Sequence, residues 1–452
     1  MSETICAIST PCGSGGIAVV RVSGEQAITL VDSLFRGKSR LADAHGGTAH
    51  YGEITVPGSG ETVDEVVATV FRAPHSFTGE DTVEVSCHGS MYIQQELLRV
   101  LVDAGCRLAR AGEFTQRAFL NGKLDLAEAE AVADLIAAQS RAERDLALRQ
   151  LKGHVSDEIK NLRSRLLEFT SLIELELDFA DHEELEFADR SALRELAEEI
   201  AQRVGRLTGS FKTGNAIKNG IGVAIIGETN VGKSTLLNAL LQDERAIVSD
   251  IEGTTRDTVE ERLTIDGMPF RIIDTAGLRT TQDTIEQMGI ARSLRAAEEA
   301  QIIVHVRTSP DGLCLADKAH EPVFDTSGKT VIEVVNKADL LHACTPAEHP
   351  DAVFISAKNR DIAPLLSRLR EAGERLTGTR DAATISNVRH YEALLRAQRA
   401  IGSVREGLDS GISGEFLSMD LQDCLGALGE ITGQITSDEV LQNIFSHFCI
   451  GK

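Results

Sequence analysis

The sequence predicts a multidomain chain with an N-terminal α+β domain, a discontinuous all-α domain, and an α/β domain inserted into the helical one. Three patterns lead to this prediction. Short β-like runs punctuated by Gly and Pro fill residues 1–118, apolar residues at helical spacing follow over 119–216, and strands alternate with helices over 217–378. Helical sequence returns over 379–452. An insertion explains helices on both sides of the α/β block; two unrelated helical domains are the alternative.

The N-terminal segment has the pattern of one compact α+β domain. Strands are predicted at 17–22, 65–71 and 82–86, and a helix near 91–104.

The first helical part is predicted as long helix from about Leu124 to Phe179. Its apolar residues recur every three or four positions, as in a buried seam: Leu151, Val155, Ile159, Leu162, Leu166, Phe169 and Ile173. The acidic run over 174–199 is interpreted as a solvated helix face or loop, with a cation site as the alternative.

The α/β block has predicted strands at 223–226, 270–273, 331–335 and 353–355. In the second helical part, one helix face carries Leu421, Cys424, Leu425 and Leu428. Thr436 and Glu439 are predicted to form a capping box at the start of the last helix.

Composition limits the possible functions. The 452 residues include 69 acidic and 46 basic side chains, a formal net charge of −23, which argues against a general nucleic-acid coat. Any RNA contact would therefore use a local patch or a partner. With 42% hydrophobic and 25% charged residues, wholesale disorder is excluded.

Two features of the sequence favour the cytoplasm. The first cation is Arg21, and no apolar run approaches the roughly 20 residues of a membrane span, so we expect neither export nor a membrane anchor. The eight cysteines are scattered without a C-x-x-C pair, which argues against a disulfide framework and a structural zinc site. We therefore expect a soluble cytoplasmic protein.

Residues 227–234 fit the pattern G-x-x-x-x-G-K-[ST] and lie between an apolar strand and a helix-like segment. In such loops, backbone N–H groups and the helix N-terminus close around phosphates, here with Lys233 reaching the β- and γ-phosphates and Ser234 binding Mg²⁺. Nucleotide contacts are predicted for Asn230, Val231, Gly232, Lys233, Ser234 and Thr235.

Three further motifs follow on predicted strand ends. Asp274, with Thr275 and Gly277, would hold Mg²⁺ through water and place an N–H near the γ-phosphate. Asp339 can accept hydrogen bonds from guanine N1 and N2, which adenine cannot supply, and this excludes an ATP-using P-loop kinase. The remaining base contacts are predicted for Asn336, Lys337, Ser356, Ala357 and Lys358. Four motifs in this order predict a GTPase domain.

The catalytic group is less evident from the motifs. Thr254 and Thr255 lie in a predicted switch segment, Thr255 being a candidate Mg²⁺ ligand. Leu278 stands where Ras-type enzymes have their water-orienting Gln. The Asn230 oxygen would allow a monovalent cation to supply positive charge beside the phosphates. Glu286 is a candidate to orient water; a solvated helix residue is the alternative.

Cys449 lies fourth from the last residue, but Gly451 and Lys452 do not fit a prenylation signal. A packed small side chain and a functional thiol both remain open for this cysteine.

The whole sequence resembles the MnmE (TrmE) family of tRNA modification GTPases. Besides the nucleotide motifs, the resemblance is carried by residues 15–24, 76–81, 112–126, 253–257 and 448–452. It implies an N-terminal folate-binding dimerisation domain, a discontinuous helical domain and an inserted P-loop GTPase (G) domain. Departures are confined to Glu228, Thr229 and Val231 in the phosphate loop and a weakly patterned link over 309–330.

The resemblance also implies an activity. Family members are potassium-activated GTPases whose G domains pair across their nucleotide faces. With the FAD-dependent partner MnmG, they add an aminomethyl or carboxymethylaminomethyl group at C5 of the wobble uridine of tRNAs. The reaction uses a tetrahydrofolate-borne carbon and ammonium or glycine. The expected cofactors are GTP, Mg²⁺, K⁺ and 5-formyltetrahydrofolate or a related folate.

Carried over residue by residue, the resemblance assigns further roles. Arg21, Glu84, Lys123 and Lys452 match the folate contacts, and Cys449 matches a C-terminal cysteine important for modification. The potassium site corresponds to Asn230, Ser249, Ile251 and Thr254, and the water-orienting glutamate to Glu286.

The expected partners are a second copy bound through the N-terminal domain, an MnmG-type protein in a heterotetramer, and tRNA in weak direct contact, with no membrane. The basic stretches 203–218 and 389–405 are candidates for that tRNA contact. Two other functions remain as alternatives: a ribosome-assembly GTPase that acts as a binding switch, and a scaffold that holds GTP without hydrolysing it.

Overall fold

The computed structural model describes residues 3–178, 189–243, 246–248, 261–273, 295–308, 326–340, 352–378 and 383–452. The chain divides into two compact units. The first comprises Met1–Ala133, Leu151–Arg163 and Leu428–Lys452, and the second comprises Asp134–Gln150 and Ser164–Ala427. No helix in the described ranges is long and apolar enough to cross a membrane.

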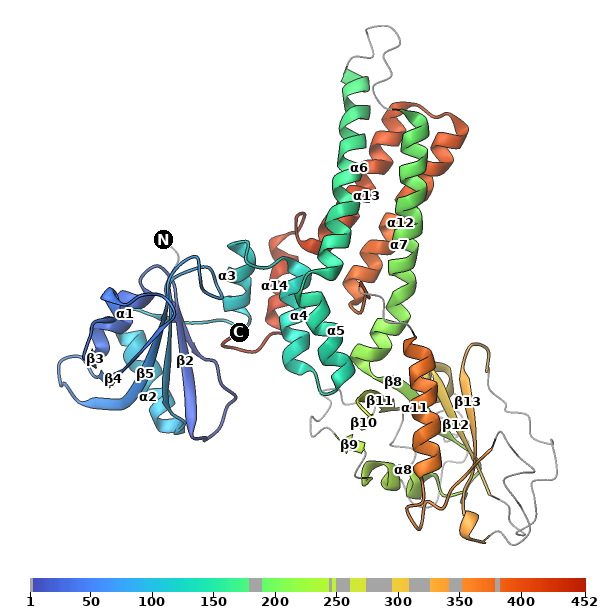
Figure 1. Cartoon of the computed structure of the whole chain (residues 1–452), viewed down its shortest axis with the longest axis horizontal. Coiled ribbons are helices and arrows are strands. Elements are labelled where there is room, and N and C mark those ends of the chain that lie inside the picture. The colour runs from blue at the N-terminus through green and yellow to red at the C-terminus, as the bar shows by residue number, and fades with distance from the viewer. Residues whose placement is uncertain are drawn as a thin grey trace. The chain divides into compact units, whose positions relative to one another are not determined.

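The first unit contains a seven-stranded sheet in the order β3-β4-β5-β6-β2-β1-β7 (Figure 1). Neighbouring strands are antiparallel except β1 and β7, which are parallel. The strands are β1 (Ile5–Ile8), β2 (Ile17–Ser23), β3 (Phe35–Gly37), β4 (Thr48–Thr55), β5 (Thr62–Phe71), β6 (Thr82–His88) and β7 (Arg107–Leu108).

Alternation of apolar and polar residues gives this sheet a buried face. On that face Val20, Val22 and Val85 pack in one cluster with side chains of α1 (Ala27–Leu34) and α2 (Met91–Asp103). On the other face Ile5 and Ala7 pack against Phe114 of α3 (Glu113–Leu120). The strands predicted at 17–22, 65–71 and 82–86 and the helix near 91–104 are confirmed as β2, β5, β6 and α2.

Two segments far apart in the sequence complete the first unit. Leu126 and Ala129 of α4 (Leu126–Ala137) pack with Leu441 and Phe445 of α14 (Asp438–Ser446). The predicted capping box at the start of α14 is wrong in its register. Ser437 is the N-cap, and its hydroxyl accepts from the Val440 N–H at 3.4 Å.

The helical part of the second unit contains α5 (Arg141–Leu151), α7 (Arg190–Asn219) and α12 (Val388–Ser410), with most of α6 (His154–Asp178) and α13 (Gly414–Thr432). α7 and α12 run antiparallel: Phe211 stacks on Tyr391 with ring centroids 4.2 Å apart, and further along Glu198 pairs with Arg405. Leu421, Cys424, Leu425 and Leu428 of α13 are buried, as the sequence predicts.

The long helix predicted from Leu124 to Phe179 is instead three helices, α4, α5 and α6. A capping box that the sequence analysis missed starts α5: the Glu143 N–H donates to the Ser140 hydroxyl at 3.2 Å, and Glu143 accepts from the Gln139 N–H at 2.7 Å. Gly153, with φ of 82°, separates α5 from α6. Five residues of the predicted seam, Val155, Ile159, Leu162, Leu166 and Ile173, are buried in α6, whereas Phe169 is half-buried and Leu151 is half-buried at the end of α5.

The second unit also holds a seven-stranded sheet in the order β14-β13-β12-β8-β11-β10-β9. The five neighbouring strands β14, β13, β12, β8 and β11 are parallel to one another. β10 is antiparallel to both of its neighbours, β11 and β9. They are β8 (Ile221–Ile226), β9 (Ala246–Val248), β10 (Glu261–Ile265), β11 (Met268–Ile272), β12 (Ile302–Arg307), β13 (Thr330–Val335) and β14 (Val353–Phe354). The predicted strands at 223–226, 270–273, 331–335 and 353–355 are confirmed as β8, β11, β13 and β14.

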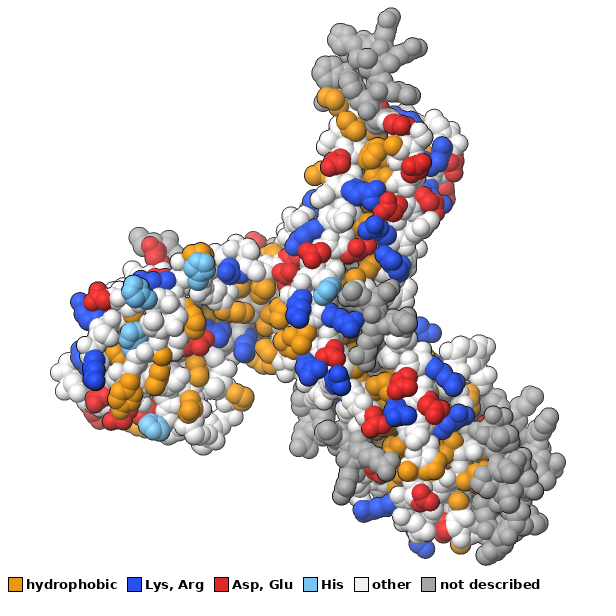
Figure 2. All heavy atoms as spheres, in the orientation of Figure 1, with side chains coloured by type: hydrophobic (Ala, Val, Ile, Leu, Met, Phe, Trp, Pro, Cys, Tyr) orange, Lys and Arg blue, Asp and Glu red, His pale blue; other side chains and the backbone are white. Residues whose placement is uncertain are grey.

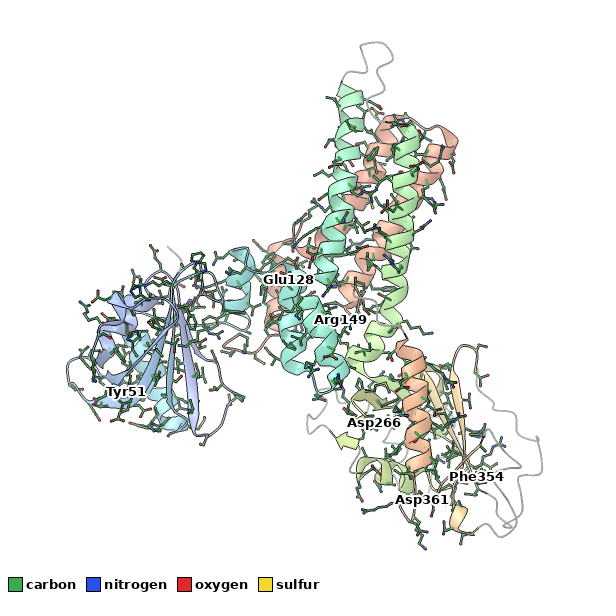
Figure 3. The ribbon with its side chains drawn as sticks, in the orientation of Figure 1. Tyr51, Glu128, Arg149, Asp266, Phe354 and Asp361 are labelled. Atoms are coloured by element: carbon green, nitrogen blue, oxygen red, sulfur yellow. The ribbon has the colours of Figure 1, made fainter. Side chains whose placement is uncertain are left out.

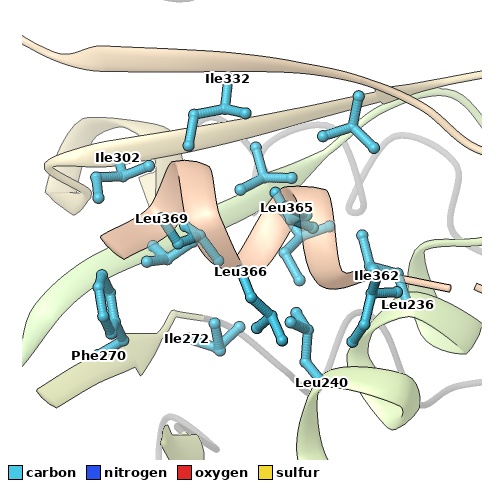
Figure 4. Packing of buried hydrophobic residues seen from close by; sticks show 14 of the residues in the cluster. Leu236, Leu240, Phe270, Ile272, Ile302, Ile332, Ile362, Leu365, Leu366 and Leu369 are labelled. Atoms are coloured by element: carbon cyan, nitrogen blue, oxygen red, sulfur yellow. The ribbon is translucent and has the colours of Figure 1, made fainter. Parts of the chain in front are cut away.

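Helices pack against this sheet as a parallel sheet requires. Leu365, Leu366 and Leu369 of α11 (Ala363–Thr377) lie in one cluster with Leu236 and Leu240 of α8 (Lys233–Leu241) and the apolar side chains of the strands (Figure 4). β8 is buried along its whole length, so the loop that follows it starts from a rigid position.

Candidate functional site

The loop between β8 and α8 is shaped by backbone conformations that few residues adopt. Asn230 has φ of 63° and Gly232 has φ of 93°, both in the left-handed region. A Cβ atom on Gly232 would lie 2.4 Å from Asn336 Nδ2. Only glycine fits there, and α8 begins at the next residue, Lys233, so the positive end of its helix dipole opens into the loop.

Lys233 is held within this loop. Its ammonium group donates to the carbonyl oxygens of Gly227 at 2.9 Å and Glu228 at 2.7 Å. Burial lowers its pKa from the ordinary lysine value. Ser234 and Thr235 follow in the first turn of α8 and are exposed, so their hydroxyl groups are accessible to a bound phosphate and its metal ion.

The predicted base-binding residues lie together beside the loop. Asn336 is buried, donates to the Val231 carbonyl at 2.8 Å and accepts from the Ala357 N–H at 3.0 Å. Lys337 donates to the Asn230 carbonyl at 2.9 Å. Asn336 therefore ties the phosphate loop to the segment that carries Ser356, Ala357 and Lys358.

Asp339 points toward the same segment. The Ser356 hydroxyl donates to Asp339 Oδ1 at 2.6 Å, and this bond lowers the pKa of the Asp339 carboxyl. Asp339 is thus ionised at neutral pH and accepts hydrogen bonds only. A guanine base, which offers two N–H donors on one edge, is the complementary partner.

Eight predicted residues of this site lie outside the described residues: Ser249, Ile251, Thr254, Thr255, Asp274, Thr275, Gly277 and Glu286. The geometry above therefore concerns the phosphate loop and the base-binding side. Of the predicted potassium ligands, only Asn230 is described; its side chain is exposed, and its amide oxygen is of the type that binds hard cations.

A second cluster lies on the N-terminal sheet. Arg21 on β2 pairs with Glu84 on β6, Nη2 and Nε lying 2.8 and 2.9 Å from Glu84 Oε1. The guanidinium carbon lies 5.4 Å from the ring centroid of Phe77 and 5.6 Å from that of Phe114. Lys123 approaches from the segment after α3 and donates to the Pro74 carbonyl at 3.0 Å. Of the four predicted folate residues, Glu84 thus lies at the end of the segment 74–84, and Arg21 and Lys123 contact that segment.

The C-terminal residues reach the same sheet. Ser9, just beyond β1, donates to the Gly451 carbonyl at 3.1 Å, and Ile450 forms a β-bridge with Ala111. A Cβ atom on Gly451 would lie 2.1 Å from the Ile8 carbonyl oxygen, so the tail lies directly on the end of β1. Cys449 is exposed, and its carbonyl accepts from the N–H of Lys452 at 3.3 Å.

The sequence analysis gave no role to several residues that shape this cluster. Arg117, almost fully buried, donates to Glu80 Oε2 at 2.9 Å, to Glu113 Oε1 at 3.3 Å and to the Glu3 carbonyl at 2.8 Å. Burial alone would raise the pKa of the Glu113 carboxyl, but hydrogen bonds from Arg107 and the Arg110 N–H lower it to about 2. The i, i+4 spacing of Glu113 and Arg117 was the available signal.

The fold and the loop define a guanine-nucleotide-binding protein of the P-loop class. Comparison with known proteins makes the assignment narrower. The profile described as "MnmE helical domain" matches residues 126–449, and that described as "GTP-binding protein TrmE N-terminus" matches residues 4–123.

Curated relatives match over their full length. The tRNA modification GTPase MnmE of Parabacteroides distasonis is 53% identical over 462 aligned residues, which cover 100% of both chains. The protein of the same name from Bacteroides thetaiotaomicron is 50% identical over 466, covering 100% of this chain and 99% of the relative. The chain belongs to the MnmE family.

A solved structure of the G domain of the T. maritima FeoB iron transporter also matches, with 22% identity and a TM-score of 0.24. It covers 35% of this chain and 99% of that one. We draw no conclusion from a likeness at this level.

Proposed function

We propose that this protein hydrolyses GTP and couples hydrolysis to the modification of tRNA at C5 of the wobble uridine. It would act with an FAD-dependent MnmG-type partner, adding an aminomethyl or carboxymethylaminomethyl group from a tetrahydrofolate one-carbon unit. One observation supports the proposal: a phosphate loop with the Asp339 carboxylate beside it, and a cationic, aromatic cluster on the N-terminal sheet, which the C-terminal tail contacts at Ser9, occur in one chain of this family.

The direct experiment compares tRNA nucleosides from cells with and without the gene. We expect 5-aminomethyl-type uridines at the wobble position to disappear on deletion and to return with the intact gene, by nucleoside mass spectrometry. Unchanged nucleosides, together with co-sedimentation of the protein with ribosomal particles, would instead favour a ribosome-assembly GTPase.

The folate part of the proposal concerns Arg21, Glu84, Lys123 and Lys452. The chemistry of the donor set fits a folate: Glu84 offers acceptors to the amino-pyrimidinone edge, while the Lys123 and Lys452 ammonium groups suit the glutamate carboxylates. A bound folate would supply the one-carbon unit. The protein groups would bind and orient it, and the exposed Cys449 thiol would act near it.

In the GTP site, each predicted residue would have its own role, although Thr255 and Glu286 lie outside the described residues. Lys233 and the α8 N-terminus would bind the β- and γ-phosphates, Ser234 and Thr255 would hold Mg²⁺, and Asp339 would select guanine. Glu286 would orient the attacking water. Bound Mg²⁺ supplies charge that stabilises the phosphates as negative charge develops on them.

Potassium dependence is the first expected result for this site. We propose that Asn230, Ser249, Ile251 and Thr254 hold K⁺, which supplies positive charge where Lys233 alone is insufficient. GTP turnover by the full-length protein should rise by at least about 10-fold when KCl replaces NaCl at equal ionic strength, since the proposed site would hold K⁺ but not Na⁺, and only a bound cation adds positive charge beside the transition state. Equal rates in the two salts would contradict the cation site.

Direct contact with tRNA is proposed to be weak. The basic stretches 203–218 and 389–405 lie on α7 and α12, where acids pair with several of their cations. Arg203 pairs with Glu199 at 2.8 Å, and Arg405 pairs with Glu198 at 2.6 Å. Acidic and basic side chains are interspersed over these helices (Figure 2). The MnmG-type partner would then provide most of the contacts with tRNA, within a heterotetramer that the two proteins form.

A homodimer through the N-terminal domain is also proposed. The outer face of β4 and β5 exposes Tyr51 at 65% and Val67 at 39%, and Ile17 at the start of β2 is 71% exposed. A second copy of this chain would cover them. We further propose that the domains span residues 1–118, 119–216, 217–378 and 379–452. We also propose that the protein acts in the cytoplasm, where tRNA is modified.

A further inference from the structure

Strands β10 and β11 form a hairpin that ends in a tight turn at Asp266 (Figure 3) and Gly267. Both turn residues have positive φ, 49° and 81°, as in the two-residue turns that join antiparallel strands. The strands pair from Glu261 opposite Ile272 to Ile265, the residue before the turn. Because the pairing continues up to the turn, a displacement of the strands moves the tip of the hairpin with them.

The tip of this hairpin caps the first turn of α5. The Ala142 N–H donates to the Gly267 carbonyl at 3.2 Å, and a Cβ atom on Gly267 would lie 3.4 Å from Arg141 Cβ. The next N–H along the helix, that of Glu143, is already bonded to the Ser140 hydroxyl. Since N–H groups in the first turn have no partner within their own helix, the hairpin provides the acceptor for Ala142.

α5 is bound in turn to the other helices of the second unit. Ala142 and Leu146 pack in one cluster with Ile217, near the end of α7. Gln150, near the other end of α5, is buried and donates to the Ser386 hydroxyl at 3.0 Å, in the segment that leads into α12. A shift of the first turn of α5 therefore acts on both α7 and α12.

A cavity of about 180 Å³ lies beside this contact, with Asp134, Lys218 and Arg262 in its wall. Asp134 of α4 and Lys218 of α7 form an ion pair at 2.8 Å, whereas Arg262 comes from β10. Close packing makes a protein interior resist displacement. Beside the hairpin that packing is interrupted, so the hairpin has space to shift relative to α5.

The other end of the hairpin leads to the GTP site. β11 pairs with β8, the strand before the phosphate loop. Along the chain, β10 follows the predicted switch residue Thr255, and β11 ends just before Asp274. In GTPases, segments that contact the γ-phosphate and its Mg²⁺ change when that phosphate is lost. Both strands of the hairpin are thus connected directly to residues that would respond to hydrolysis.

We propose that the tip of the β10–β11 hairpin and the first turn of α5 form a coupling contact, through which the nucleotide in the GTP site shifts α5 and the helices packed on it. The proposal rests on the proposed GTP hydrolysis and adds to it the place where the GTP site acts on the helices. Coupling is reciprocal, so a change that holds α5 against the hairpin must alter the preference between GTP and GDP.

Amide hydrogen exchange of the full-length protein tests the contact without a mutation. Protein saturated with GDP is compared with protein saturated with a non-hydrolysable GTP analogue. Exchange in the first turn of α5 should differ at least about 5-fold between the two, the lower end of common coupling strengths. α2 of the N-terminal sheet is the control helix and should exchange equally. Equal exchange of α5 in both nucleotide states would overturn the coupling contact.

A disulfide across the contact tests the reciprocal effect. The 3.4 Å between the Cβ positions of residues 141 and 267 is close to the Cβ separation in disulfides, so Arg141→Cys combined with Gly267→Cys should cross-link on mild oxidation. The ratio of the Kd for GDP to that for the GTP analogue should change at least about 5-fold between the reduced and oxidised forms. Gly267→Cys alone, oxidised in the same way, controls for backbone strain and should keep its ratio.

The outcomes separate the coupling contact from the proposed function. A protein that binds neither nucleotide would contradict the proposed GTP hydrolysis, and the coupling contact would fall with it. If both nucleotides bind but the cross-link leaves their ratio unchanged, the GTP site stands and the coupling contact is wrong. Failure of the two cysteines to cross-link, in a variant whose thermal unfolding shows it to be folded, would mean that hairpin and helix do not meet, and would overturn it as well.

Discussion

Asp339→Asn will change the base that this protein selects, from guanine to xanthine. The GTP dissociation constant is expected to rise about 100- to 1,000-fold, equivalent to about 3–4 kcal/mol, because two hydrogen bonds to a charged acceptor are affected. Xanthosine triphosphate should bind the variant more tightly than GTP. Competition of GTP and of xanthosine triphosphate against a fluorescent nucleotide analogue measures the affinity of the variant for each.

The reason lies in the donors and acceptors around Asp339. Its carboxylate only accepts, and the Ser356 hydroxyl already donates to Oδ1 at 2.6 Å. An asparagine amide oxygen can keep that bond, but its NH₂ group then faces the base. Guanine presents an amino group there, so two donors meet; xanthine presents a carbonyl oxygen, which accepts.

Asp361→Asn supplies the matched control. Asp361 lies in the same region (Figure 3), is exposed, and is bound to Ser356 through its backbone, with N···O distances of 3.1 and 3.0 Å. The substitution makes the same change in charge without touching those bonds. GTP affinity should stay within about 2-fold. An equal loss in both variants would mean that charge near the site, rather than base recognition, governs affinity.

The sequence predicted those parts of the molecule whose cause is local. The phosphate loop is short and lies between two regular elements, so its residues fixed both its place and its chemistry. The same is true of Asn336, which directly follows the parallel strand β13, and of Asp339, three residues further on. Asp339 and Ser356 are 17 residues apart, yet both lie at the ends of neighbouring strands, and topology alone brings them together.

Helix boundaries were less well predicted, because periodicity continues across a break. The apolar spacing over 124–179 gave no sign of interruption, but Ser140 and Glu143 start a new helix by satisfying backbone N–H groups. At α14 the pattern was right and the register was one residue off, since Ser437 has the extended backbone of a cap and its hydroxyl accepts from the Val440 N–H.

Contacts between distant segments had no local signal. The meeting of Gly451 with Ser9 and the pairing of Arg405 with Glu198 follow from how sheets and helices pack. From sequence, the stretch 389–405 is basic with a single acid in it; in the structure, the antiparallel neighbour α7 adds acids alongside it. Charge counted along the chain therefore overstated the positive surface available to RNA.

Gly232→Ala is expected to abolish GTP binding. A Cβ atom there would lie 2.4 Å from Asn336 Nδ2, and φ is 93°, which strains any residue with a side chain. Relief would require Asn336 to give up its bonds to the Val231 carbonyl and the Ala357 N–H. Strain and two lost buried bonds together cost about 3–5 kcal/mol, which should appear as at least about a 100-fold loss of GTP affinity and a lower unfolding temperature.

Gly402→Ala shows what the same chemical change does where geometry permits it. Gly402 lies within α12, and no atom lies within 4 Å of the Cβ position. Because alanine favours helix over glycine, this variant should be more stable by up to about 1 kcal/mol, with unchanged GTP affinity. The two variants differ only in where a methyl group is placed. Wild-type affinity in Gly232→Ala would mean that Asn336 does not fix the phosphate loop, and that the tie between base recognition and phosphate binding lies elsewhere.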